Sequence, residues 1–194
     1  MISKNLNCIY IHIPKTGGMS IETILGADIK ELHNKSIKIK HGYPTDWNYP
    51  KYWEKYYKFT FVRNPWDRVV SSYFYNLAMA KKKINMNDHD RNKIILYDKE
   101  GFNNYIINHL EDSKSRFFLP YDCWIGKHKY DFIGKLENFE ENMKLVCNDL
   151  KISFKNVHIN KSKHKTYKEY YNNKAKDIVK DLYKKDIDRF SYCF

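Results

Sequence analysis

The 194-residue sequence lacks any apolar run near the ~20 residues that a membrane-spanning helix needs. The apolar stretch within its first residues, MISKNLNCIYIHIPK, is too short for a signal peptide. It also lacks a CxxC pair, because its four cysteines are widely scattered: Cys8, Cys123, Cys147 and Cys193. This spacing argues against a disulfide framework or a zinc site and is typical of a reducing compartment. The sequence therefore predicts a soluble, cytoplasmic protein.

No internal repeat and no linker rich in Pro, Gly or Ser divides the chain, so we expect a single domain over residues 1–194. Apolar residues make up 42% of the chain, enough to build a core and to exclude wholesale disorder. Lys and Arg number 35 against 23 Asp and Glu, which gives a net charge of +12. This excess predicts an anionic partner: nucleic acid, a nucleotide, an acidic glycan or a membrane surface.

Strand and helix signals alternate along the chain. Short apolar runs rich in Ile, Tyr and Phe predict strands at residues 6–13, 57–62 and 130–136. Apolar residues at helical spacing predict helices at residues 19–25, 64–80, 102–110, 139–150 and 174–190. Strand–loop–helix units in this order predict an α/β fold with a parallel sheet that helices cover on both faces. Phosphate-bearing ligands bind at the carboxyl ends of strands in such folds.

The stretch CIYIHIPKTGGMSIE, residues 8–22, carries the clearest chemical signal. A strand runs into a Gly-Gly turn, and a helix begins directly after it. The backbone N–H groups of such a turn and of the helix start form a cradle for an anion. Lys15 adds a cation, Thr16 and Ser20 add hydroxyl donors, and Gly17 and Gly18 allow close approach. The alternative is an ordinary strand-to-helix turn.

This loop is not a Walker A sequence. That motif places its lysine after the second glycine, whereas Lys15 precedes both glycines here. An ATPase that grips Mg²⁺ and the β- and γ-phosphates is therefore disfavoured.

A second candidate anion site lies in FTFVRNPWDRVVSSYFY, residues 59–75. Arg63 ends the predicted strand, Asn64 is typical of a helix N-cap, and Ser71 follows two turns into the helix. An arginine, a serine and a helix N-terminus together can bind a phosphate. The alternative is that Arg63 forms a structural ion pair. Two such sites at strand ends favour a doubly phosphorylated nucleotide.

These two stretches resemble the nucleotide-binding motifs of the PAPS-dependent carbohydrate sulfotransferases, in the branch of the heparan sulfate and uronyl 2-O-sulfotransferases and the HNK-1-type enzymes. FIGKLENFEENM (132–143) and INKSKHKTYKEYY (159–171) extend the resemblance over nearly the whole chain. It implies the sulfotransferase fold, a single P-loop-like α/β domain, and transfer of a sulfuryl group from PAPS to a carbohydrate hydroxyl, which leaves 3′,5′-ADP.

The resemblance also implies the roles of particular residues. The 5′-phosphosulfate would be surrounded by Lys15, Thr16, Gly17, Gly18, Met19 and Ser20. The 3′-phosphate would be held by Arg63 and Ser71, and the nucleotide would be covered by Lys161, Ser162 and Lys163. Relatives place a residue near the adenine where Leu136 stands, although we interpret Leu136 as core.

Sulfuryl transfer builds negative charge on the leaving phosphate oxygen, so a positioned cation lowers the barrier, and we assign Lys15 to that role. The acceptor hydroxyl needs a base. We assign His41, in the segment IKHGYP, because relatives use a histidine in a similar segment and imidazole titrates near neutral pH. His33 is a fallback, and we interpret His12 as packed or adjacent to phosphate. No acidic pair is placed for a metal, so no divalent ion is expected.

The expected acceptor is a carbohydrate or glycan with a free hydroxyl, and the aromatic residues of 43–57 can equally form a sugar-binding cleft, core or a lid. Three alternatives compete. A basic nucleic-acid-binding module explains the net charge, but no recognisable module of that kind appears, and we expect no nucleic acid partner. A small-molecule kinase on a related fold is opposed by the missing Walker lysine. An inactive relative that only binds the nucleotide is opposed by the presence of Lys15 and His41.

Overall fold

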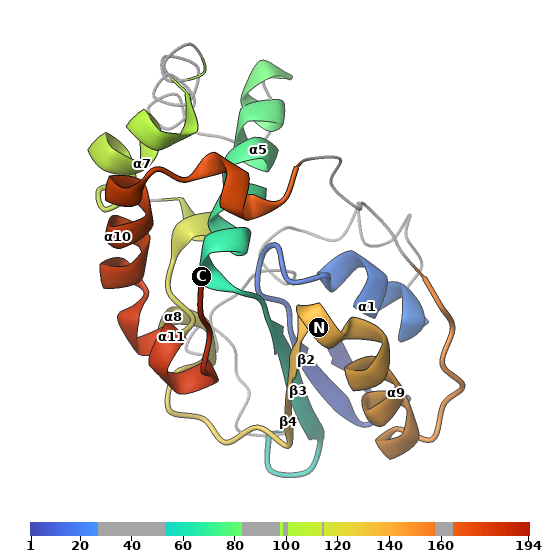
Figure 1. Cartoon of the computed structure of the whole chain (residues 1–194). Coiled ribbons are helices and arrows are strands. Elements are labelled where there is room, and N and C mark those ends of the chain that lie inside the picture. Colours follow the sequence, from blue (N-terminus) through green and yellow to red (C-terminus); the bar gives the residue numbers. More distant parts are fainter. Residues whose placement is uncertain (27–52, 83–97, 99–100, 114, 158–164) are drawn as a thin grey trace. The chain divides into compact units, whose positions relative to one another are not determined.

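The computed structural model describes residues 1–26, 53–82, 98, 101–113, 115–157 and 165–194 (Figure 1). The chain groups into two compact units, which we call the sheet unit and the helical unit. The sheet unit comprises Met1–Arg63 and Tyr121–Lys161, and the helical unit comprises Asn64–Pro120 and Ser162–Phe194. Each unit has its own hydrophobic core and is described separately.

The sheet unit contains four strands in the spatial order β1-β2-β3-β4: β1 (Ile2–Ser3), β2 (Cys8–Ile11), β3 (Tyr57–Val62) and β4 (Phe132–Lys135). Strands β2, β3 and β4 are parallel, with Tyr10 opposite Phe59 and Phe59 opposite Phe132. The expected parallel sheet is confirmed for these three strands, and the edge strand β1 differs, because it pairs antiparallel with β2. The cause is a tight turn over residues 4–7, which reverses the chain within the segment that we predicted to begin a single strand.

Helices α1 (Gly18–Ile24) and α9 (Phe139–Asp149) pack on one face of this sheet (Figure 1). The core between them is built from Cys8, Tyr10, Phe59 and Phe61 of the strands with Ile21, Ile24, Met143, Val146 and Cys147 of the helices. The side chains that alternate with these along the strands, such as Ile9 and Ile11, are buried as well. Strands that are apolar on both sides are typical of parallel sheets in α/β proteins. A short helix, α8 (Asp122–Ile125), completes the unit.

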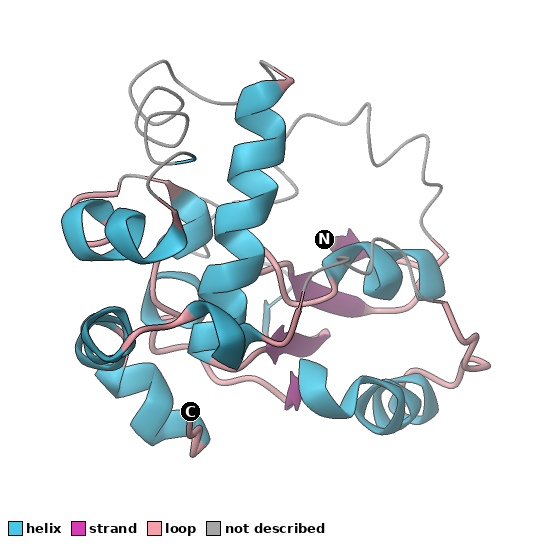
Figure 2. Cartoon of the chain, turned by 45° about the horizontal axis from the view of Figure 1, so that its top comes forward, coloured by secondary structure: helices cyan, strands magenta, loops and turns pink. Residues whose placement is uncertain are grey.

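The helical unit contains α5 (Pro65–Lys81), α7 (Phe102–His109), α10 (Asn173–Leu182) and α11 (Lys184–Phe190), with short 3₁₀ turns at Arg116–Phe118 and Tyr167–Tyr170 (Figure 2). Helix α5 begins as the sequence predicts. The Asn64 side chain accepts a hydrogen bond of 3.1 Å from the Trp66 N–H, and Pro65 occupies the first helical position.

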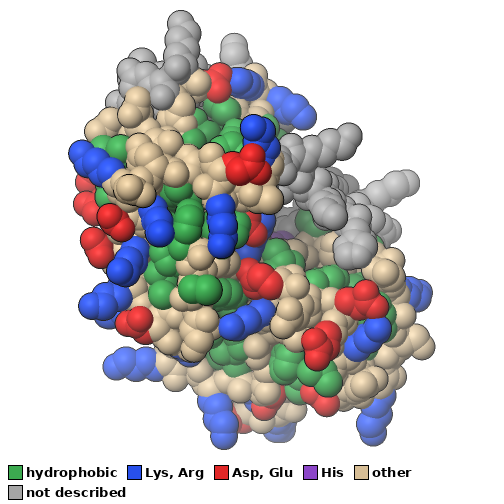
Figure 3. Space-filling view, in the orientation of Figure 1, with side chains coloured by type: hydrophobic (Ala, Val, Ile, Leu, Met, Phe, Trp, Pro, Cys, Tyr) green, Lys and Arg blue, Asp and Glu red, His purple; other side chains and the backbone are tan. Residues whose placement is uncertain are grey.

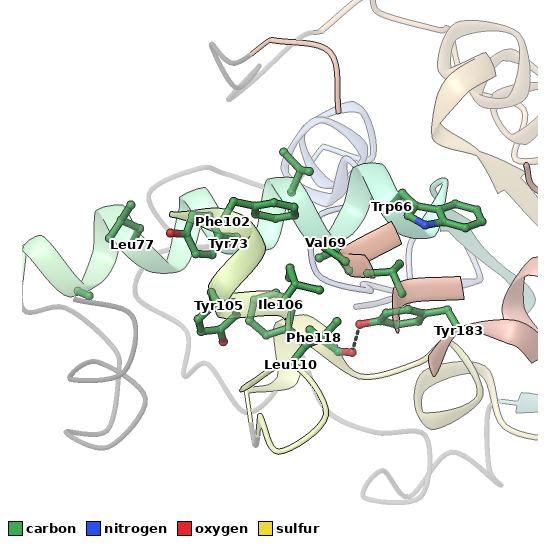
Figure 4. Close-up of a cluster of buried hydrophobic side chains, with 14 residues drawn as sticks. Trp66, Val69, Tyr73, Leu77, Phe102, Tyr105, Ile106, Leu110, Phe118 and Tyr183 are labelled. Atoms are coloured by element: carbon green, nitrogen blue, oxygen red, sulfur yellow. Dashed lines mark hydrogen bonds between the residues drawn. The ribbon is translucent and has the colours of Figure 1, made fainter. Parts of the chain in front are cut away.

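The prediction of one helix over residues 174–190 is wrong, because it is broken at Tyr183. Tyr183 leaves helical geometry and is fully buried, and its hydroxyl donates a hydrogen bond to the Phe118 carbonyl (Figure 4). This contact lies inside the core of the unit, where aromatic side chains from α5 and α7 meet, among them Tyr73, Phe102 and Tyr105. A tertiary contact thus overrides the apolar periodicity of the segment.

Within the described part of the chain, no helix combines the length and the apolar character needed to span a bilayer.

Candidate functional site

The loop between β2 and α1 has a backbone that restricts which residues it can contain. Gly17, which caps α1, has φ of +83°, a conformation that favours glycine. A Cβ at this position would also lie 2.8 Å from the Leu136 side chain. Lys15 adopts φ of +69°, which costs a non-glycine residue on the order of 1 kcal/mol. The loop therefore holds a strained conformation at the position that the sequence assigns to the anion-binding lysine.

Thr16 is fully buried, and its hydroxyl donates a hydrogen bond of 2.9 Å to the Ile13 carbonyl. We expected this hydroxyl to be a donor to the anion. In the structure it instead closes the turn on itself, so that Thr16 fixes the direction of the loop backbone. The role of Thr16 in binding the anion stays a prediction.

Lys15 and Arg63 bring two positive charges together at the carboxyl ends of two neighbouring parallel strands. Lys15 follows β2 and Arg63 follows β3, and an Arg63 guanidinium nitrogen donates to the Lys15 carbonyl at 3.3 Å. Burial, with a further contribution from the Arg63 charge, lowers the pKa of Lys15 to about 8. Two adjacent like charges removed from water raise the free energy of the folded state, and a bound anion relieves this cost. The binding of an anion between these two cations stays a prediction.

Tyr121 holds the backbone of Arg63, a role that sequence analysis did not identify. The Arg63 N–H donates to the Tyr121 hydroxyl at 2.9 Å, and the same hydroxyl donates to the Arg63 carbonyl at 2.6 Å. The Tyr121 side chain is completely buried. Because 58 residues separate the two positions, no local pattern in the sequence points to this contact.

Other predicted site residues lie where the sequence places them, at the start of α1. Ser20 is buried in the first turn, and the Met19 carbonyl accepts a hydrogen bond of 2.9 Å from the Thr23 hydroxyl. Gly18 lies against the imidazole of His12. Leu136, which we interpreted as core, is half-buried and contacts Gly17 of the loop. The sheet unit thus brings together the residues predicted for the phosphosulfate, and it adds Arg63.

Ser71, the predicted partner of Arg63, belongs to the helical unit, where it is buried on α5. Its joint action with Arg63 stays a prediction. Arg68 lies in the same helix, α5. Its side chain is buried, and it donates a hydrogen bond of 2.9 Å to the Leu119 carbonyl.

Several predicted residues fall outside the described part of the chain: His41, His33, Lys161, Ser162 and Lys163. Their assignments stay predictions. Of the aromatic stretch 43–57, residues 53–57 are described, and Trp53 is buried against His128, with a distance of 4.8 Å between ring centroids. Among the described residues, no group of three or more His, Cys, Asp or Glu side chains is arranged to hold a metal ion.

Comparison with known proteins identifies the class. Residues 1–193 match the model of the Sulfotransferase family, so the chain belongs to that family. Its members transfer sulfuryl groups. No curated protein and no solved structure gives a significant match.

The contact between Tyr121 and Arg63 predicts the effect of Tyr121→Phe. Removal of the hydroxyl leaves both backbone groups of Arg63 without this partner, and we expect unfolding free energy to fall by about 1–3 kcal/mol. Urea denaturation measures this loss. Tyr130→Phe is the matched control, because the Tyr130 hydroxyl makes one longer bond, of 3.3 Å, to the Ile125 carbonyl. Equal losses in the two variants would contradict the special role of Tyr121.

Proposed function

We propose that the protein transfers a sulfuryl group from PAPS to a hydroxyl of a carbohydrate or glycan. The observation that carries this proposal is the pair of cations, Lys15 and Arg63, at adjacent strand ends beside the glycine loop. Membership of the Sulfotransferase family supports the reaction type, and members of this family generally use PAPS as donor. The sequence motifs support the carbohydrate branch.

The residues of the sheet unit fit such a donor. PAPS carries a phosphosulfate on one side of its ribose and a phosphate on the other, and the site supplies one cation for each. The loop from Lys15 to Ser20 suits the phosphosulfate, because it adds Lys15 to the backbone N–H groups of a glycine turn that runs directly into α1. Arg63 suits the 3′-phosphate, since a guanidinium forms paired, charge-assisted hydrogen bonds to phosphate oxygens. Ser71, Lys161, Ser162 and Lys163 are proposed to add further contacts.

The donor supplies a sulfuryl group, which passes from its phosphate oxygen to the acceptor oxygen and leaves 3′,5′-ADP. Lys15 stabilises the charge that develops on the leaving oxygen, and it can do so only in its ammonium form. With a pKa of about 8, Lys15 is largely protonated at pH 7. His41 is proposed to accept the proton of the acceptor hydroxyl. No step in this scheme requires a metal ion.

The net charge of +12 is weaker evidence for a particular ligand than the local pair of Lys15 and Arg63. Figure 3 shows Lys and Arg side chains spread over the displayed face and interleaved with Asp and Glu, rather than gathered in one basic area. A dispersed charge attracts anions in general but selects none. The specific cations therefore determine the ligand.

Calorimetric titration with 3′,5′-ADP tests the proposed donor. We expect 3′,5′-ADP to bind at least about tenfold more tightly than 5′-ADP, since a charge-assisted hydrogen bond contributes about 1.5–3 kcal/mol. ATP without magnesium is the third ligand. Arg63→Ala should abolish the preference for 3′,5′-ADP, whereas Arg189→Ala, at an exposed arginine of α11, should keep it. Absence of any preference in the unmodified protein would refute the proposal.

The lowered pKa of Lys15 predicts how this affinity depends on pH. Anion binding favours the ammonium form, so affinity is full below the free pKa and falls as pH rises through about 8. We expect the dissociation constant for 3′,5′-ADP to increase by about tenfold from pH 7 to pH 9. Lys15→Arg should flatten the profile, because a guanidinium stays charged over this range. A flat profile in the unmodified protein would contradict the role of Lys15.

The assignment of His41 predicts a separation of binding from transfer. His41→Ala should lower the rate of sulfate transfer by roughly 10²- to 10⁴-fold, because the general base is lost. The affinity for 3′,5′-ADP should stay unchanged. Transfer is measured with ³⁵S-labelled PAPS and a panel of glycan acceptors, with His33→Ala as the comparison. Full turnover by His41→Ala would exclude His41 as the base.

A further inference from the structure

A buried pair of ionisable residues, His12 and Glu22, lies next to the glycine loop and takes part in no step described above. The His12 Nδ1 and Glu22 Oε1 atoms are 2.7 Å apart. The side chains are 6% and 1% exposed, so the bond is shielded from water. An ionised Glu22 carboxylate accepts hydrogen bonds and does not donate them, so beside it His12 Nδ1 carries the proton of this contact. A charge-assisted bond of this length in a dry environment fixes the orientation of the imidazole.

The ring of His12 is fixed on two further sides. It stacks on Tyr10, with a distance of 5.7 Å between the ring centroids and an angle of 30° between the planes. Its Nε2 end points at Gly18, the first residue of α1. A Cβ added to Gly18 would lie 2.0 Å from Nε2, closer than any real contact. Gly18 does not have a positive φ, so the space for the imidazole, rather than the backbone conformation, requires glycine here.

The pair joins the two ends of the loop. His12 directly follows β2, and Glu22 lies in α1, beyond the loop. The segment between them includes the strained Lys15 and the Thr16 hydroxyl bond to Ile13. A strained residue persists only where the surrounding structure determines its conformation, and this bridge provides such a constraint.

We propose that His12 and Glu22 are positioning residues for donor binding. Their hydrogen bond holds the end of β2 and the start of α1 at the spacing at which the loop presents its N–H groups and Lys15 to an anion, and Gly18 provides the space for the imidazole. The inference rests on the proposed function only for the identity of that anion, the phosphosulfate side of the donor.

Two substitutions at His12 separate the hydrogen bond from simple filling of space. His12→Asn keeps a donor near the position of Nδ1, and His12→Gln instead places its amide near the position of Nε2. We expect His12→Gln to weaken binding of 3′,5′-ADP by at least about tenfold and His12→Asn to weaken it by less than about threefold, because small displacements of binding groups are costly. His128→Gln, at an exposed histidine, is the control for the same change of residue type.

A double substitution tests the contact between His12 and Gly18 without any ligand. Gly18→Ala alone should lower the melting temperature by about 5 °C, because the new methyl group overlaps the imidazole. In a His12→Ala background the methyl group has room, so the same Gly18→Ala change should lower the melting temperature by much less. Equal effects of Gly18→Ala in the two backgrounds would overturn the proposed contact.

The outcomes distinguish this inference from the proposed function. Binding of 3′,5′-ADP by the unmodified protein, together with equal losses in His12→Asn and His12→Gln, would overturn the positioning role alone. Failure of the unmodified protein to bind 3′,5′-ADP would overturn the proposed function, and with it the donor as the ligand of this loop. Near-ultraviolet circular dichroism confirms that each variant used for binding is folded.

Discussion

The close approach of Lys15 and Arg63 is the interaction on which the site depends. Two cations that lie near each other and partly out of water repel each other, which raises the free energy of the folded state. Other contacts hold both residues in place. Arg63 is fixed through its backbone by the buried Tyr121 hydroxyl, and its guanidinium donates to the Lys15 carbonyl. Burial, and after it the Arg63 charge, lowers the pKa of Lys15, and an anion bound beside the two cations would favour the ammonium form. Such a pair of cations, held in place by the fold, suits the anion binding that we propose.

The conformation of the glycine loop follows from packing around it as much as from its own residues. Gly17 needs its positive φ and also the absence of a side chain beside Leu136. Gly18 needs only the absence of a side chain, because the imidazole of His12 occupies that space. Glycine is thus required at the two adjacent positions for different physical reasons, one conformational and one steric. A turn that only had to reverse the chain would tolerate a residue larger than glycine at the second position.

The parts of the fold that the sequence predicts are those with local signals. Strand β3 and the start of α5 coincide with the prediction, because an apolar run and the Asn64 cap act within a few residues. The break at Tyr183 escaped prediction, because the hydrogen bond that Tyr183 makes there goes to Phe118, 65 residues away in the chain. For the site, the loop and Arg63 could be found from motifs. Tyr121 could not, because its contact to Arg63 joins distant segments.

Arginine is scarce in this chain, and its use at two positions near the end of β3 shows what the residue type contributes. Arg63 and Arg68 each donate to a backbone carbonyl, of Lys15 in one case and Leu119 in the other. A guanidinium has five N–H groups in a planar fork, so it can satisfy a carbonyl and still donate in another direction, whereas a lysine ammonium is a compact point charge.

At Arg68 this capacity serves a buried structural contact. Arg63 is only half-buried. Its guanidinium donates to the Lys15 carbonyl of the loop, and its positive charge acts on Lys15. A lysine at position 63 would supply the charge but not the planar fork, and therefore arginine suits a side chain that contacts the loop and takes the part in donor binding that we propose.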